Sequence, residues 1–153
     1  MGSQGFLARA AFLVLWLGAV PASALLFEDA SSADAKGLAI LWVRDCGTRE
    51  PRSSCKQGET QFWVDDSARL ENRLAAKRRG GKPYDEVWLF SGGGVLNEGI
   101  LIARVLRNHR MTVRVRSGTM CVSSCTVAFM GGLFRYVDAG ATYQVHSASS
   151  FSK

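Results

Sequence analysis

Short apolar runs of strand length alternate with longer segments of helix length along most of this chain. The strand-like runs are residues 37–43, 87–90, 111–116 and 141–146. The helix-like segments between them are residues 65–79, 97–107 and 121–129. A strand, a helix and a further strand form a right-handed crossover between parallel strands. The alternation therefore predicts an α/β fold with a largely parallel sheet and crossover helices.

The N-terminal 24 residues have the pattern of a secretory signal peptide. Arg9 is followed by an uncharged apolar stretch of 11 residues, Ala10–Val20. This stretch is shorter than the roughly 20 residues of a membrane-spanning helix. Pro21-Ala-Ser-Ala24 then has the small-x-small pattern that signal peptidase recognises. We expect cleavage after Ala24, a short linker over residues 25–36, an α/β domain over residues 37–153, and export to the periplasm.

Four cysteines in an exported chain indicate disulfides. Cys46 and Cys55 bracket a polar, turn-rich segment that a disulfide would close into a loop. Cys121 and Cys125 are a second candidate pair, although one helical turn orients two side chains poorly for a bond. Spacing alone leaves all three connectivities open. The two histidines lack zinc-finger spacing to either cysteine pair, so no metal and no cofactor are expected.

A glycine cluster, Ser91-Gly92-Gly93-Gly94, follows the strand-like run 87–90 directly. Glycines at the carboxyl end of a strand allow a sharp turn that presents bare N–H groups at the sheet edge, where α/β folds bind ligands. The cluster lacks the spacing and the lysine of nucleotide-binding loops. Taken alone, the cluster is better explained as a plain strand-to-helix turn than as a binding loop.

The order of these pieces resembles the Clp protease proteolytic subunit family, and also signal peptide peptidase A, within the ClpP/crotonase-like fold. The similarity covers a strand ending in Phe90-Ser-Gly-Gly-Gly, the segment Cys121-Val-Ser-Ser-Cys125, a Gly-Gly break and a strand that ends in His146. Periplasmic Clp-like proteins with a Cys-x-Ser-x-Cys segment resemble it most. The resemblance implies a serine hydrolase that acts on polypeptides and forms homo-oligomers.

The resemblance also implies a role for each matching residue. Ser123 would be the nucleophile, with Ser124 as the other serine in the same place. His146 would be the general base that a serine hydroxyl needs at neutral pH. Gly93 and the N–H of Ser124 would hold the oxyanion, with Gly92 and Gly94 in the substrate-binding loop. The non-catalytic interpretation of the same residues is that the serines cap a helix and that His146 is a hydrogen-bonded histidine at the end of a strand.

The third member of a catalytic triad is missing from the matching positions. In the Clp family an aspartate of a later helix orients the histidine, but this sequence ends seven residues after His146. The resemblance thus implies a domain truncated at its C-terminus. Asp138 and Glu98 are the acids that could substitute, and a serine–lysine pair is a further alternative. Loss of the orienting acid lowers activity by orders of magnitude, so a non-catalytic Clp-like domain for peptide binding or assembly remains the second hypothesis.

The chain is basic, with a formal net charge of +6. Arginines gather in and after the second helix-like segment, at positions 104, 107, 110, 114 and 116. A solvated face explains such a group, and an anionic membrane surface or an acidic partner is the functional alternative. No aromatic residues are interleaved for base stacking, so nucleic acid is not expected as a partner. We also expect the last strand, 141–146, to be an open edge that promotes self-association.

Overall fold

The computed structural model describes residues 25–49, 55 and 61–147. Its elements in chain order are β1 (Leu25–Asp29), α1 (Ser32–Ala35), β2 (Ile40–Asp45), α2 (Asp66–Arg79), β3 (Glu86–Phe90), α3 (Leu96–Asn108), β4 (Thr112–Val115), β5 (Met120–Val122), α4 (Ser124–Phe129), β6 (Phe134–Val137) and β7 (Thr142–Gln144).

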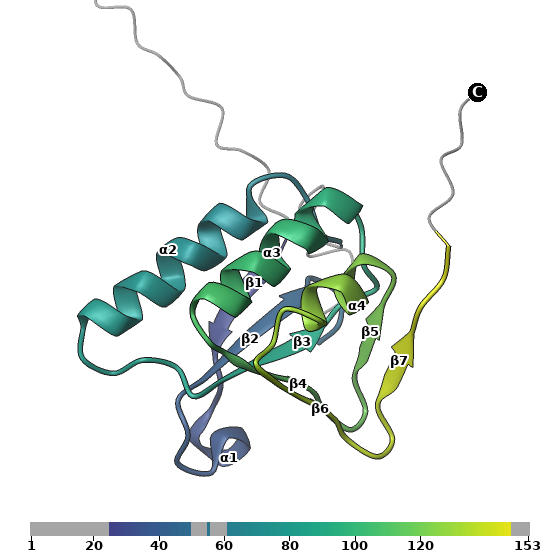
Figure 1. Ribbon diagram of the computed structural model, residues 1–153. Coiled ribbons are helices and arrows are strands. Elements are labelled where there is room, and N and C mark those ends of the chain that lie inside the picture. Colours follow the sequence, from purple (N-terminus) through teal and green to yellow (C-terminus); the bar gives the residue numbers. More distant parts are fainter. Residues whose placement is uncertain (1–24, 50–54, 56–60, 148–153) are drawn as a thin grey trace, which may run out of the picture.

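Five strands form one sheet in the order β1-β2-β3-β4-β6 (Figure 1). β1 runs antiparallel to β2, and the other neighbouring strands are parallel. A second sheet pairs β5 with β7, also in parallel. The predicted α/β fold with a largely parallel sheet is therefore confirmed.

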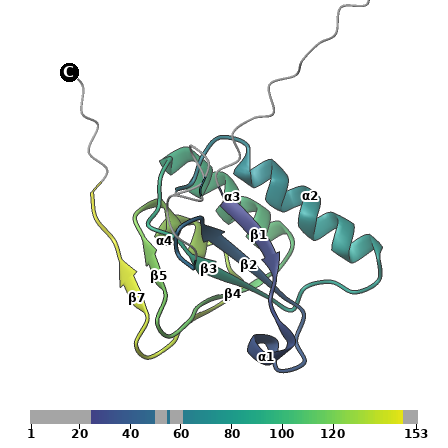
Figure 2. The same cartoon turned by 180° about the vertical axis from the view of Figure 1, so that it is seen from behind.

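Helices α2, α3 and α4 lie together on one face of the five-stranded sheet (Figures 1 and 2). Side chains of a strand alternate between its two faces, and β2 follows this rule. Leu41 and Val43 belong to the main core under these helices, whereas Ile40 and Trp42 belong to a smaller cluster on the other face. Ala35 of α1 packs in that smaller cluster. Because both faces are covered, every residue of β2 is buried.

Three stretches differ from the sequence-based predictions. Residues 25–36 were expected to be a linker, but they form β1 and α1, because Leu25 and Phe27 pack into the main core. A helix was predicted to open at Cys121, but Met120–Val122 is a strand and α4 begins at Ser124. No strand was predicted for Phe134–Val137, which forms β6 at the edge of the main sheet.

Candidate functional site

The glycine loop after β3 lies against the turn that carries the two serines. Ser91 pairs with the strand before that turn, since its N–H donates to the Met120 carbonyl at 2.9 Å and its carbonyl accepts from Val122 N–H at 3.0 Å. Gly93 has a φ of 104°. A Cβ at Gly93 would lie 2.7 Å from the Ser123 Cβ. Only glycine therefore allows this close approach of the two segments.

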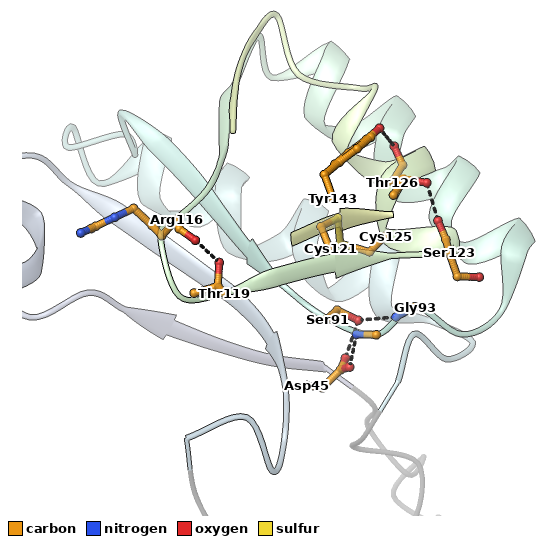
Figure 3. Close-up of a disulfide and its surroundings, with 11 residues drawn as sticks. Asp45, Ser91, Gly93, Arg116, Thr119, Cys121, Ser123, Cys125, Thr126 and Tyr143 are labelled. Carbon is orange, nitrogen blue, oxygen red and sulfur yellow. Dashed lines mark hydrogen bonds between the residues drawn. A yellow bond between two sulfur atoms is a disulfide. The ribbon is translucent and has the colours of Figure 1, made fainter. Parts of the chain in front are cut away.

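Asp45, at the end of β2, fixes the glycine loop from the other side. Its buried carboxylate accepts from the Ser91 hydroxyl at 2.6 Å and from Gly92 N–H at 2.8 Å. The Ser91 Oγ in turn accepts from Gly93 N–H at 3.0 Å (Figure 3). The expected oxyanion donor, Gly93 N–H, thus has an internal acceptor in this arrangement. A substrate oxyanion would have to replace Ser91 Oγ at that N–H group.

Sequence reasoning did not find Asp45. Two features of the sequence indicate Asp45 weakly: it is an acidic residue at the end of a buried strand, and it directly precedes Cys46. In a parallel sheet the carboxyl ends of neighbouring strands lie at the same edge. Asp45 of β2 and Ser91 after β3 therefore meet at this edge. Their contact could be predicted only if the strand order were known.

Ser123 occupies the sharp turn between β5 and α4. Its φ is 57° and its ψ is −128°. Residues other than glycine rarely adopt this region, and such outliers gather at active sites. A serine on a strained strand-to-helix turn is also the arrangement by which some hydrolases expose the nucleophile.

The structure distinguishes the two candidate serines. The Ser124 hydroxyl is buried and has no hydrogen-bond partner among the described residues. Ser123 is partly exposed, and no dashed bond reaches its hydroxyl among the residues drawn in Figure 3. Its main chain is held, since Ser123 N–H donates to the Gln144 carbonyl at 3.1 Å and its own carbonyl accepts from Thr126. Ser123 therefore offers the accessible hydroxyl.

Both predicted cysteine pairs are within disulfide distance. Cys46 and Cys55 form one bond, with Cα atoms 5.6 Å apart. Cys121 and Cys125 form the other, with Cα atoms 5.2 Å apart (Figure 3). The expected difficulty of a helical turn does not arise, because Cys121 is on β5 and the chain turns at Ser123 before Cys125. This second disulfide closes the chain around Ser123.

His146 shares a cavity with Ser123. The cavity has a volume of about 510 Å³. It is lined by Gly94, Leu96, Ser123, Ser124, Thr126, Val127, Val145 and His146. The imidazole is exposed, and its Nδ1 lies 3.0 Å from the Ser147 carbonyl oxygen. A carbonyl only accepts, so Nδ1 carries the proton in this contact and the neutral ring keeps Nε2 as its acceptor. No hydrogen bond joins His146 to Ser123 within the described residues.

The two acids considered for a triad have other partners. Asp138 accepts from Arg114 Nη1 at 2.7 Å and lies 3.5 Å from Arg116 Nε. Glu98 is buried and accepts from the Ser67 N–H in the first turn of α2. Both carboxylates thus stabilise the fold, and neither is hydrogen-bonded to His146 in the described structure.

Arg114 of β4 and Arg116, which directly follows this strand, are likewise used within the fold. Arg114 donates to Glu86 at 2.9 Å as well as to Asp138, and these bonds raise the pKa of its guanidinium. Arg116 stacks over the Trp88 ring, 4.2 Å from its centroid. Part of the arginine group predicted as a solvated or membrane-facing surface is therefore neutralised by internal partners.

Neither a metal centre nor a membrane span is found in the part of the chain that the structure describes. No three His, Cys, Asp or Glu side chains there are grouped as metal ligands. No helix among those residues combines the length and the apolar character needed to cross a bilayer.

Comparisons with known proteins give one structural similarity. No protein-family model matches the chain, and no curated protein matches it. The fold is similar to the crystal structure of a protein described as an enoyl-CoA hydratase from Streptomyces coelicolor A3(2), with 15% sequence identity and a TM-score of 0.45. The similarity covers 92% of this chain and 52% of that chain. This chain therefore spans about half the length of the solved structure to which it is similar.

Proposed function

We propose that the protein is an exported serine hydrolase of the Clp-like kind, acting on polypeptides, with Ser123 as its nucleophile. The observation that carries the proposal is the main-chain conformation of Ser123, φ 57° and ψ −128°, at a strand-to-helix turn bordering a cavity. Strain of this kind costs free energy and persists where function requires it.

The proposed reaction is an acyl transfer. Ser123 Oγ attacks the carbonyl carbon of a peptide bond, and Nε2 of His146 takes the hydroxyl proton and returns it to the leaving amine. Water then hydrolyses the acyl-enzyme. The main-chain nitrogen of Ser124 lies 3.1 Å from the position that a Cβ at Gly93 would occupy. Ser124 N–H and a released Gly93 N–H would together hold the oxyanion.

A serine-directed fluorophosphonate probe tests the proposal. The oxidised chain should be labelled at one site, and Ser123→Ala should abolish labelling because the reactive hydroxyl is gone. Ser117→Ala, which removes an exposed hydroxyl elsewhere, is the matched control and should label like the parent. His146→Ala should slow labelling about 100-fold or more, as for loss of a general base.

A non-catalytic peptide-binding domain is the second candidate. It is favoured by the internal acceptor of Gly93 N–H and by the other partners of Asp138 and Glu98. A folded chain with both disulfides formed that takes up no probe, yet binds unfolded polypeptide, would establish this candidate and overturn the hydrolase.

A further inference from the structure

The main-chain nitrogen of Leu25 is bound by a buried carboxylate. Leu25 is the first residue of β1 and is 0% exposed. Its nitrogen donates to Asp66 Oδ1 at 3.1 Å. Asp66, the first residue of α2, is also 0% exposed. The contact joins the beginning of the sheet to the beginning of the longest helix.

Asp66 is better suited to bind a cation than an amide. A buried carboxylate is costly to leave ionised unless it is paired and hydrogen-bonded. Its Oδ2 accepts from Trp63 N–H at 2.8 Å, and Oδ1 also accepts from Arg69 Nη1 at 2.8 Å. Arg69 is partly exposed and Asp66 is fully buried, so the carboxylate is paired with a cation that is itself partly solvated. Burial raises the pKa of Asp66 in spite of these bonds.

The bound nitrogen is also the one that the predicted signal cleavage would release. Hydrolysis of the Ala24–Leu25 peptide bond by a signal peptidase adds one water across it. Ala24 leaves with a carboxylate, and Leu25 keeps its nitrogen as an amine that takes up a proton at neutral pH. A cut one residue earlier or later would place the new amine away from Leu25 N.

We infer that Asp66 is a receptor for the mature N-terminus, in which the α-ammonium of Leu25 forms a buried ion pair with this carboxylate. Cleavage replaces a neutral N–H donor with a charged one on the same acceptor. Hydrogen bonds between ionised groups are about twice as strong as neutral ones. Maturation thus stabilises the junction of β1 and α2. The inference depends on the predicted cleavage and not on the proposed hydrolase activity.

Melting temperatures of two oxidised chains test the inference. One chain begins at Leu25 and the other at Ala22, so that residue 25 keeps its peptide amide. Each is made with Asp66 and with Asp66→Asn, which removes the charge and keeps one of the two oxygen acceptors. The loss of the other acceptor affects both starts alike. The chain that begins at Leu25 (the Leu25 start) should melt about 3–6 °C higher than the chain that begins at Ala22 (the Ala22 start). Asp66→Asn should reduce this difference in melting temperature below about 1 °C. Equal melting temperatures for the two starts, or a difference that survives Asp66→Asn, would overturn the inference.

Acylation of the α-amine gives a second measurement that needs no substitution. A buried ammonium paired with a carboxylate is protonated and shielded from an acylating reagent. At pH 7 the α-amine of the Leu25 start should react about tenfold more slowly than that of the Ala22 start, as followed by mass spectrometry. Equal rates would show that the mature N-terminus is free in solvent and would contradict the ion pair.

Discussion

At the scale of single residues, the backbone conformation of Ser123 lowers the stability of the folded chain. A non-glycine residue in its backbone region costs about 1–3 kcal/mol. Three local features hold it there: the N–H bond to Gln144, the carbonyl contacts with Thr126, and the disulfide that closes around it. These constraints hold Ser123 beside the cavity in this backbone conformation.

Replacing Ser123 by glycine and by alanine separates strain from chemistry. Both changes remove the hydroxyl, but only glycine adopts a φ of 57° without a Cβ penalty. Ser123→Gly should therefore be about 1 kcal/mol more stable than Ser123→Ala, after the extra flexibility of unfolded glycine is allowed for. Urea unfolding of both oxidised chains measures the difference. An alanine variant as stable as the glycine variant would show that the turn is unstrained.

Some of the proximities at the candidate site could be predicted from the sequence, and others could not. Ser123 and His146 were chosen from a pattern, and the fold places both on one cavity. The Cys46–Cys55 pair could be predicted because a short polar loop separates the cysteines. Asp45 could not, because its bonds to Ser91 and Gly92 depend on β2 and β3 being neighbours.

At the scale of elements, α4 is held against α3 by two close backbone approaches. A Cβ at Gly99 of α3 would lie 2.5 Å from the Ser124 carbonyl oxygen. A Cβ at Gly131, just after α4, would lie 2.1 Å from the Ala103 carbonyl oxygen. Backbone atoms cannot rotate away as a side chain can, so both positions require glycine.

Gly131→Ala should destabilise the fold by about 2 kcal/mol or more, because α4 must move away from α3 to make room. Gly80→Ala is the control: its added Cβ would lie 3.5 Å from the nearest atom, an ordinary contact, and its φ of −74° suits alanine. The control should stay within about 1 kcal/mol of the parent. Thermal unfolding of both variants tests this, and equal effects would mean that the α3–α4 contact can relax freely.

Arg114 connects β3, β4 and the turn after β6 through Glu86 and Asp138. Burial acts to raise the pKa of Glu86, but hydrogen bonds from Arg114 and Trp88 outweigh it and lower this pKa below the ordinary value of 4.5. The unfolded chain then binds more protons than the folded chain between the two pKa values. The stabilisation from Glu86 is therefore full above about pH 4.5 and is lost as the pH falls through the folded pKa.

Glu86→Gln should lower the free energy of unfolding at pH 7 by about 1–2 kcal/mol, since the charged acceptor of Arg114 is lost. It should also make stability fall less steeply below about pH 4.5. Glu71→Gln, which removes an exposed carboxylate bound to His109, is the control and should change stability by less than about 1 kcal/mol. Urea unfolding from about pH 3 to about pH 7, a range that includes the ordinary carboxyl pKa of 4.5, measures both. An unchanged pH profile in Glu86→Gln would contradict the assignment.

The two long helices and most of the strands could be predicted from the sequence, but the short strands β1, β5 and β6 could not. Helices over 65–79 and 97–107 were expected, and α2 and α3 match them closely. β5 has three residues and was taken as the start of a helix, because its strand character comes from pairing with β7. β6 is exposed throughout, so it lacks the buried face by which sequence patterns reveal strands.

At the scale of the whole molecule, one side of the main sheet exposes apolar residues. β6 is the last strand in the order and pairs with β4 on one side. Leu133, Phe134, Tyr136 and Val137 are all more than a third exposed, with Phe134 at 59%. An unpaired strand edge next to exposed apolar side chains favours association with another chain.

The sequence predicted an open edge at residues 141–146, where β7 pairs with β5 on one side. Because β6 is exposed throughout, we predict that the mature chain self-associates through β6 instead. Light scattering over a range of concentrations should show a mass that rises above that of the monomer. Phe134→Lys should shift the chain toward monomer, because a charge on an edge strand opposes pairing. Leu101→Lys, at an exposed leucine of α3, is the control and should leave association unchanged. A parent chain that stays monomeric at every concentration would contradict the prediction.

The placement of the disulfides has a consequence for when the site can work. Cys46 directly follows Asp45, the residue that fixes the glycine loop, and Cys121–Cys125 encloses Ser123. In a reducing cytoplasm all four sulfurs are thiols, so neither disulfide holds the segment after Asp45 or the turn at Ser123. Before its disulfides form, the proposed hydrolase would therefore be inactive toward the other proteins of the cytoplasm. If the chain is exported as we propose, oxidation outside the cytoplasm would form both disulfides and complete the proposed site there.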